Sequence, residues 1–380
     1  MKILFINCEY PPVGGGGGVG NKILAKELAK NHEVDILTSG DQDTPYYSKE
    51  GNVEIFRVRS FLRESRWSSG IISLSFFCIS AFVKGFSLVK KNKYNIVHSF
   101  FALPSGLVGV ALSKIFRIPH VLTIVGGEIY DPTKSISPDR NRLTKLAVRN
   151  VINLSDRVTS ISNDIKVRAR LLGISSEKEI FVIPLGFEPP PYKISYKKRT
   201  SKEYTLITIA RLVERKGIQY LIKAMARLKD KRIRLVIVGD GPEKEKLISL
   251  STKLNVTDRV KFVGFITGKP KYKLLSSADC FVSTSLHEGL GLVFFEAMYC
   301  GLPILATNVG GQTDFLEDGK TGFLVRPERP RELADVILKL QNDGALVKEI
   351  SIYNRKKVKT YYISKISGGY KKIYKYLYGY

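Results

Sequence analysis

Two acidic residues, Glu288 and Glu296, lie in the stretch STSLHEGLGLVFFEAMYCGLPILATN with seven residues between them. Two glycines follow the first acid and disfavour a regular helix there, so we expect an apolar helix to begin near Leu292 or Val293, with Glu296 in its first turns. Free N–H groups at such a helix start form an anion site. Because carboxylates are poor phosphate ligands, the two acids should contact a neutral group rich in hydroxyls, such as a ribose or a sugar.

Two cations belong to a separate stretch, ARLVERKGIQYLIKAM, residues 210–225. Arg211 and Lys216 follow an apolar strand-like run and precede Gly217 and a helical pattern. Arginine offers a planar fork for phosphate oxygens, and lysine offers a point charge. Two exposed loop cations would be the ordinary interpretation of either residue alone. Beside the two acids, they favour a site for a diphosphate.

A run of five glycines, residues 14–18, separates an apolar strand-like stretch from an amphipathic helical stretch. This arrangement points free N–H groups at an anion. A dinucleotide-binding interpretation would also require an acid at the end of the next strand, which instead ends in Thr38, Ser39 and Gly40. We therefore expect a phosphate site without nicotinamide, and the alternative is a flexible surface loop without a ligand. The candidate donor-binding residues here are Gly15, Gly16, Gly17 and Gly18.

Strand-like runs alternate with helical stretches along most of the chain, which is typical of parallel sheets wrapped by helices. The stretch PLGFEPPPYKISYKKRTSK interrupts the pattern with proline and lysine. We expect an α/β protein with two Rossmann-like, doubly wound domains, 1–185 and 203–359, joined by a linker at 186–202 and facing each other across a cleft. The tail at 360–380 is expected to pack back on the first domain, with a membrane anchor as the alternative. The predicted strands are 2–7, 33–38, 53–58, 95–98, 120–125, 157–161, 180–183, 204–210, 233–241, 260–265, 279–285, 303–308 and 321–325.

The chain carries 61 Lys and Arg against 35 Asp and Glu, a formal net charge of +26. This excess favours an anionic partner, either acidic lipids or phosphate-bearing substrates, although lysines on an ordinary solvated surface are the alternative. No zinc finger, ribonucleoprotein motif or dense basic arm is present, so we expect no nucleic-acid partner. The four cysteines form no CxxC pair and indicate a reducing compartment. The first residues lead directly into a strand without a signal peptide, so we expect a cytoplasmic protein.

Residues 71–89 form a long apolar stretch that contains serines and a lysine near its middle. We expect a buried or surface-lying helix here and not a membrane span. The preceding sequence RVRSFLRESRWSS mixes cations with an interfacial aromatic residue. We predict that 57–89 contacts the inner face of an anionic membrane through Arg63, Arg66 and Trp67, with a plain core helix and loop as the alternative.

The sequence resembles the retaining glycosyltransferases of family 4, which have the two-domain GT-B fold. The resemblance extends over nearly the whole chain and is most specific at about residues 204–326. It is carried by the pair Glu288 and Glu296 in the family's E-x7-E spacing and by the following stretches: ARLVERKG, VIVGDGP, VKFVGF, SSADCFVSTS, HEGLGLVFFEAMYCGLPILATNVGG, DGKTGFLV and the glycine loop.

The resemblance implies a role for each matching residue. Arg211 and Lys216 would bind the diphosphate of the donor and stabilise the leaving group, Glu296 would hold the ribose hydroxyls, and Glu288 would contact the donor sugar. The remaining donor-binding residues would be the first-domain glycine loop, Gly291, Leu292 and Val293 around the phosphates, and Gly264 and Phe265 near the base.

The resemblance also implies retaining transfer from a UDP- or GDP-sugar to a hydroxyl of a sugar or lipid-linked acceptor in glycan biosynthesis. Front-face attack, with the departing phosphate accepting the proton, is the mechanism that it implies. No metal and no other cofactor are expected. The alternatives are a nucleotide-sugar epimerase or a phosphorylase on the same scaffold, or a catalytically silent protein that binds membranes or anions.

One stretch departs from the family pattern. Relatives often have a histidine in a T-x-H-G turn, but this chain has TIVGGEIYD, which places Val125 there. His98 could supply an imidazole on the acceptor side, with a satisfied core histidine as the alternative. We expect Glu128 or backbone groups to line that side.

Overall fold

The computed structural model describes residues 1–59, 71–194 and 203–379. Arg63, Arg66 and Trp67, the predicted membrane-contact residues, lie outside these ranges, and their role stays a prediction.

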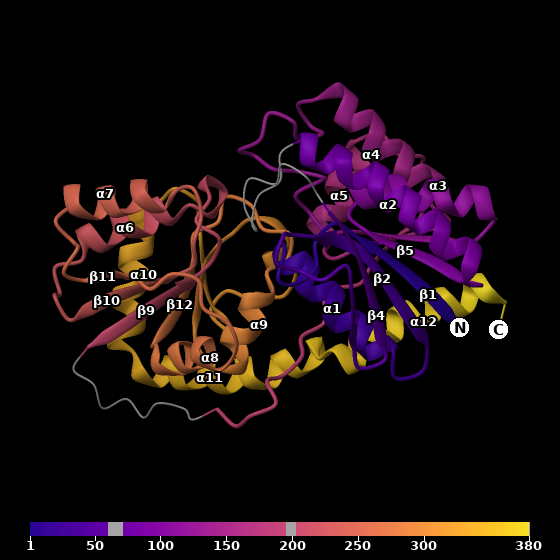
Figure 1. Ribbon diagram of the computed structural model, residues 1–380. Coiled ribbons are helices and arrows are strands. Elements are labelled where there is room, and N and C mark those ends of the chain that lie inside the picture. The colour runs from indigo at the N-terminus through magenta and orange to yellow at the C-terminus, as the bar shows by residue number, and fades with distance from the viewer. Residues whose placement is uncertain (60–70, 195–202, 380) are drawn as a thin grey trace. The chain divides into compact units, whose positions relative to one another are not determined.

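The chain divides into two compact units (Figure 1). Unit 1 contains Met1–Phe187 and Ile363–Tyr380, and unit 2 contains Glu188–Tyr362. The chain first passes from unit 1 to unit 2 after Phe187, within the proline-rich stretch that the sequence predicts to be the linker. The C-terminal helix groups with unit 1.

Unit 1 is built on an eight-stranded sheet with the order β3-β4-β2-β1-β5-β6-β7-β8. All neighbouring strands are parallel except β3 and β4. The order reverses between β1 and β5, the neighbours at the centre of a doubly wound sheet. The strands are β1 (Lys2–Asn7), β2 (Glu33–Gly40), β3 (Tyr47–Glu50), β4 (Val53–Arg59), β5 (Ile96–Phe100), β6 (His120–Ile124), β7 (Arg157–Ser160) and β8 (Ile180–Val182).

Helices cover both faces of this sheet. α1 packs with α12, and α2 packs with α3; Figure 1 shows these two pairs on opposite faces. The strands are therefore buried on both sides, which explains why β1 is a continuous apolar run whose residues Ile3 to Ile6 are fully buried. The helical elements are α1 (Gly16–Leu28), α2 (Ile71–Lys91), η1 (Ala102–Gly106), α3 (Leu107–Phe116), α4 (Arg142–Leu154), α5 (Asn163–Leu171) and α12 (Ile363–Tyr378).

Unit 2 is built on a six-stranded parallel sheet with the order β11-β10-β9-β12-β13-β14. The strands are β9 (Tyr204–Ile209), β10 (Ile233–Val238), β11 (Val260–Phe262), β12 (Cys280–Ser283), β13 (Ile304–Thr307) and β14 (Gly322–Val325). The helical elements are η2 (Glu214–Lys216), α6 (Ile218–Arg227), α7 (Lys244–Lys253), α8 (Gly268–Ser277), α9 (Leu292–Tyr299), η3 (Gly310–Asp314), α10 (Pro330–Asn342), α11 (Gly344–Lys357) and η4 (Val358–Tyr361).

The order of strands in unit 2 reverses between β9 and β12, which are hydrogen-bonded neighbours. Loops that leave neighbouring strands in opposite directions separate at such a point and leave a crevice beyond the carboxyl ends of the strands. Leu206 on β9, Cys280 on β12 and Leu305 on β13 belong to one buried core with residues of α6 and α10. This core anchors the strands from which the site loops emerge.

The helix α2 is, among the described residues, the one that is long and apolar enough to cross a membrane by length and composition alone. Phe77, Ala81 and Leu88 are nevertheless buried in the core of unit 1. The opposite side of the helix leaves apolar side chains exposed, notably Ile79 and Val83 at 65% each. The helix therefore both forms part of the core and presents an apolar surface to its surroundings.

Candidate active site

Three of the predicted site residues of unit 2, Arg211, Lys216 and Glu288, come together at the carboxyl ends of its two central strands. The loop after β9 carries Arg211 and Lys216, and the loop after β12 carries Glu288. Lys216 Nζ forms an ion pair with Glu288 Oε2, and both side chains are mostly buried. Arg211 lies close enough for its charge to act on Lys216. The site is therefore located at the point where the strand order reverses.

Burial lowers the pKa of Lys216, although the Glu288 carboxylate opposes this effect. Burial would raise the pKa of Glu288, but the charges of Lys216 and Arg215 and the hydrogen bond from Lys216 outweigh it, so that this pKa is lowered. Glu288 is therefore ionised at neutral pH. An ammonium group has three donors, so Lys216 can hold the carboxylate and still donate to a phosphate oxygen.

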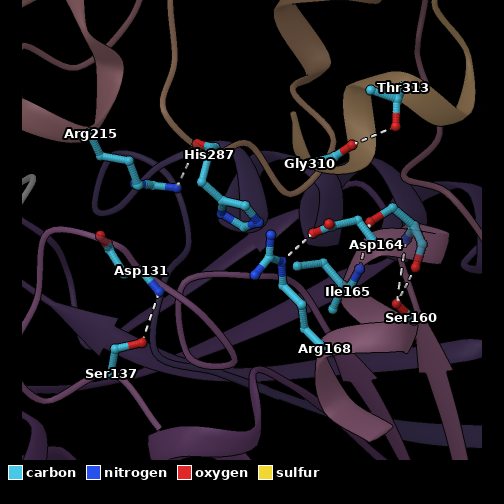
Figure 2. Close-up of polar contacts among 11 residues, drawn as sticks. Asp131, Ser137, Ser160, Asp164, Ile165, Arg168, Arg215, His287, Gly310 and Thr313 are labelled. Carbon is cyan, nitrogen blue, oxygen red and sulfur yellow. Dashed lines mark hydrogen bonds and ion pairs between the residues drawn. The ribbon is translucent and has the colours of Figure 1, made fainter. Parts of the chain in front are cut away.

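Main-chain contacts hold the two site loops against each other. Leu286 N donates to Arg215 O at 2.8 Å, and Thr284 Oγ1 donates to Lys216 O at 3.3 Å. Gly217 adopts φ 61°, and a Cβ there would overlap Thr284 O, so no other residue fits without displacing a loop. Figure 2 shows the guanidinium of Arg215 directed at the main-chain oxygen of His287. These contacts fix the separation of the lysine and the acid.

A second glycine turn holds the Glu288 backbone from the other side. Gly311 N donates to Glu288 O at 2.7 Å, and Gly310, at φ 66°, lies so close to that oxygen that a Cβ would overlap it. Thr313 Oγ1 donates back to Gly310 O at 2.9 Å and closes the turn (Figure 2). The glycines in NVGGQTD are therefore required for packing against the acid.

The predicted helix at residue 292 is α9, which begins after Gly291 at φ 86°. No side-chain oxygen caps its first turn, so the amides of Leu292 and Val293 are not used by a capping side chain. Glu296 lies in the second turn. The helix start thus retains the features of an anion site.

The loop after β11 was predicted to lie near a base. Gly264 adopts φ 74°, and a Cβ there would meet open space, while Phe265 is 55% exposed. Gly264 O accepts a hydrogen bond from Gly239 N at 2.8 Å, which ties this loop to the end of β10. An exposed phenyl ring beside the strand ends is a suitable stacking surface for a planar ring.

Lys271 on α8 is a candidate site residue that sequence reasoning did not identify. Its Nζ lies 2.6 Å from Glu296 Oε1, and both side chains are less than a fifth exposed. Lys271 precedes Glu296 by 25 residues on a different helix, so no local spacing could have indicated the pair. The packing of α8 against α9 brings them together.

The glycine loop of unit 1 packs against parts of its own chain. Gly15 N donates to Glu9 Oε2 at 2.9 Å, and Cβ atoms at Gly14 and Gly18 would clash with Glu9. A Cβ at Gly17 would clash with Phe101. At Gly16, by contrast, an added Cβ would meet no other part of the chain within 4 Å. The loop is thus shaped largely by intramolecular packing, and a donor-binding role for it stays a prediction.

His98 does not have the accessible position considered for it on the acceptor side. It is fully buried on β5, with Nδ1 at 2.6 Å from Tyr374 Oη and Nε2 at 2.7 Å from Thr123 Oγ1. Burial keeps its pKa well below the usual value of histidine. The imidazole is therefore a core group that connects β5 to α12, which is the alternative considered from the sequence.

Glu128 holds a turn at the end of β6. Its two carboxylate oxygens accept from Val125 N at 2.7 Å and from Gly126 N at 2.9 Å. Burial raises the pKa of Glu128 despite these hydrogen bonds. Phe101 nearby adopts φ 68°, a strained conformation for an aromatic residue. Phe101 and Val125 from these two loops both lie against Gly17 of the glycine loop, and the acceptor role of Glu128 stays a prediction.

No group of three or more His, Cys, Asp or Glu side chains that could hold a metal ion occurs in residues 1–59, 71–194 and 203–379.

Comparison with curated proteins identifies relatives along nearly the whole chain. An uncharacterised glycosyltransferase of Methanocaldococcus jannaschii is 29% identical, over 94% of this chain and 93% of the relative. The N-acetyl-α-D-glucosaminyl L-malate synthase of Bacillus anthracis is 27% identical, over 98% and 97%. The α-monoglucosyldiacylglycerol synthase of Streptococcus pneumoniae is 27% identical, over 89% and 78%.

Solved structures show the same fold. Sucrose-phosphate synthase from Thermosynechococcus elongatus matches 100% of this chain and 99% of its own, with a TM-score of 0.87 and 24% identity. HepE of Anabaena, solved in complex with UDP-glucose, matches 98% and 99%, with a TM-score of 0.77 and 21% identity. The fold is therefore that of the GT-B glycosyltransferases.

Two family patterns match the chain in succession. Glycosyltransferase family 4 matches residues 14–189, and glycosyl transferases group 1 matches residues 193–357. With the paired acids and cations at the strand ends and the GT-B fold of both units, the chain belongs to the family 4 glycosyltransferases.

Proposed function

We propose that this glycosyltransferase moves a sugar from a nucleoside-diphosphate sugar to a hydroxyl acceptor with retention of anomeric configuration and without a metal ion. The observation that carries this proposal is the ion pair between Lys216 and Glu288 at the reversal point of the unit 2 sheet. It places one preorganised cation and one ionised carboxylate beside the amino end of α9. A diphosphate ester linked to a sugar needs this combination of groups.

In the proposed reaction, the bond from the anomeric carbon to the diphosphate oxygen breaks, and a bond from that carbon to the acceptor oxygen forms. The acceptor proton leaves with the nucleoside diphosphate. Lys216, Arg211 and the amides of Leu292 and Val293 stabilise the negative charge that develops on the diphosphate. Each preorganised donor of this kind contributes roughly 3 kcal/mol to transition-state binding. Glu288, held in its ionised form, accepts hydrogen bonds from hydroxyls of the donor sugar.

Titration with nucleotides tests the donor. UDP and UDP-glucose bind to the structural neighbour HepE, which supports a uridine nucleotide, and a guanosine nucleotide is the alternative. Thermal-shift measurements with UDP, GDP, ADP and their sugars should therefore show stabilisation by UDP or GDP. Nuclear magnetic resonance of the product should show the anomeric configuration of the donor, and EDTA should leave turnover unchanged. Nucleoside diphosphate released at full rate without an acceptor, or an inverted product, would contradict the proposal.

Lys271→Met is expected to weaken nucleoside-diphosphate binding about tenfold, because Lys271 holds one oxygen of Glu296 and so orients the other toward the ribose hydroxyls. The same substitution should barely change the affinity for a 2′,3′-dideoxy nucleoside diphosphate, which lacks those hydroxyls. Isothermal titration calorimetry with both nucleotides measures the difference, and Lys273→Met on the same helix is the matched control. Equal losses for both nucleotides would show that Lys271 has only a structural role.

We further propose that the enzyme is cytoplasmic and acts at the inner face of a membrane. The supporting observations are the exposed apolar side of α2 and the formal net charge of +26. The relative in Streptococcus pneumoniae is named as an α-monoglucosyldiacylglycerol synthase. Co-sedimentation with anionic liposomes should be salt-sensitive and should weaken when Arg63, Arg66 and Trp67 are replaced. Binding that is indifferent to salt and to these changes would argue against a membrane face.

A further inference from the structure

A cavity of about 490 Å³ lies at one side of the unit 1 sheet, where β3 and β4 meet α2. Its volume is within the range of small-molecule sites. Because β4 is parallel to β2, the carboxyl end of β4, which lines the cavity, lies on the same edge of the sheet as the glycine loop. The lining residues are Tyr46, Tyr47, Phe56, Arg57, Val58, Arg59, Ser80 and Lys84.

Cations and aromatic rings that line this cavity are in contact with each other. The guanidinium of Arg59 lies 4.8 Å from the ring centre of Tyr46, and Lys84 Nζ lies 5.2 Å from that of Phe56. Tyr47 packs on Phe56 with ring centres 5.4 Å apart. These contacts hold the two exposed cations at the cavity without neutralising their charge.

Arg57 also lines the cavity and is only 7% exposed. Its Nη1 donates to Ser48 Oγ at 2.7 Å, and its backbone N donates to Tyr46 O at 2.7 Å. The described lining contains three cations and no acidic residue. A cavity of this composition favours an anion, and guanidinium and ammonium groups match phosphate oxygens.

The cavity adjoins the exposed apolar side of α2. Ser80 and Lys84 line the cavity, one turn apart, whereas Phe76, Ile79 and Val83 project from a neighbouring sector of the same helix. These three side chains are 41%, 65% and 65% exposed. A phosphate in the cavity would thus lie beside an apolar stripe that can accept a hydrocarbon chain.

We infer that this cavity binds the phosphate group of a lipid phosphate or diphosphate, whose hydrocarbon chain lies along Phe76, Ile79 and Val83 of α2. The inference rests on the proposed function, because it assigns the acceptor to the class of lipid-linked saccharides. Arg59 and Lys84 contact the phosphate oxygens. Tyr46 and Tyr47 enclose the group that is attached to this phosphate.

Isothermal titration of the full-length protein with farnesyl diphosphate, inorganic pyrophosphate and farnesol tests the inference. Farnesyl diphosphate should bind more tightly than either of the other two, because each of them retains only one part of the ligand. In the double variant Arg59→Gln with Lys84→Gln, we expect farnesyl diphosphate and pyrophosphate both to bind about tenfold or more weakly. The control Lys90→Gln with Lys91→Gln removes two cations from the end of the same helix and should change neither affinity.

A second double variant, Ile79→Gln with Val83→Gln, tests the apolar stripe without altering charge. This variant should bind farnesyl diphosphate about fivefold to tenfold more weakly than the wild type, and its affinity for pyrophosphate should be unchanged. Val167→Gln with Leu171→Gln, which replaces two exposed apolar residues of α5, is its control. If pyrophosphate binds as tightly as farnesyl diphosphate and the stripe variant changes neither, the lipid assignment is wrong. If the double variant of Arg59 and Lys84 binds farnesyl diphosphate and pyrophosphate as tightly as the wild type does, the cavity is not the phosphate-binding site.

Donor binding separates this inference from the proposed function. The cavity variants should bind UDP or GDP as tightly as the wild type, whereas Lys216→Ala should lose donor affinity and keep farnesyl diphosphate affinity. A wild-type protein that binds farnesyl diphosphate but no nucleotide would contradict the proposed function and leave the lipid-phosphate site standing. A wild-type protein that binds a nucleotide but not farnesyl diphosphate would contradict the lipid-phosphate site and leave the proposed function standing.

Discussion

Replacing Lys216 with alanine is expected to lower kcat/KM for the nucleoside-diphosphate sugar by about 10²–10³-fold, roughly 3–4 kcal/mol of transition-state stabilisation. The variant loses a preorganised donor to the diphosphate. It also leaves Glu288, which is mostly buried, without its principal counter-ion. Steady-state kinetics with the donor identified by titration measures the loss. Lys223→Ala removes an exposed cation from the adjacent helix and should have nearly wild-type kinetics. Wild-type turnover in Lys216→Ala would show that this lysine is not part of the catalytic site.

The pH dependence of donor affinity gives an independent check of the same residue. Only protonated Lys216 attracts the diphosphate, and burial lowers its pKa below the usual 10.5 of lysine. Affinity should therefore fall as the pH rises, and the fall should begin at a lower pH than for an ordinary lysine. Lys216→Arg should lose this alkaline limb, because arginine stays protonated throughout that range. An identical limb in both proteins would assign the titration to another group.

Replacing Glu288 with alanine is expected to reduce kcat by about 10²–10⁴-fold while leaving far-ultraviolet circular dichroism unchanged. The lost carboxylate would no longer accept hydrogen bonds from the donor sugar, and Lys216 would remain without its acid. Glu288→Gln, which keeps the shape but not the charge, should be similarly impaired. Glu349→Ala replaces an exposed acid on α11 and serves as the control. A fully active Glu288→Gln enzyme would show that the charge is dispensable.

The two residues should behave as one unit. Because Lys216 and Glu288 form an ion pair and each charge shifts the pKa of the other, the variant that lacks both should lose far less than the product of the two single losses. Multiplicative losses in this double-mutant cycle would mean that Lys216 and Glu288 act separately.

Most strands could be predicted from the sequence because a sheet buried on both faces requires continuous apolar runs. The predicted run 2–7 coincides with β1, and the predicted run 233–241 contains β10, which ends earlier, at Val238. The exception is β3, an edge strand with the sequence YSKE whose residues are exposed or half-buried. β3 has no apolar pattern, because it is held in the sheet by its hydrogen bonds to β4 and not by burial of its side chains.

The site was predictable to the extent that its residues belong to loops at strand ends. Glu288 and Lys216 could be placed together because β9 and β12 were expected in one parallel sheet. The contact of Lys271 with Glu296 and that of Glu9 with Gly15 depend on side-chain packing that no periodicity records. His98 was ambiguous for the same reason, since its partner Tyr374 is 276 residues away.

The return of α12 to unit 1 makes unit 2 an insertion in the architecture of the first. Ile363 N donates to Phe187 O at 2.9 Å, so the chain leaves unit 1 and re-enters it at adjacent points. Tyr370 and Tyr374 of α12 are fully buried beside His98, which makes a helix that follows unit 2 in the chain a part of the core of unit 1. On the ribosome, unit 1 must therefore wait for the whole of unit 2 to be made before its own interior can be completed, and loss of α12 would damage a core whose other residues precede unit 2 in the chain.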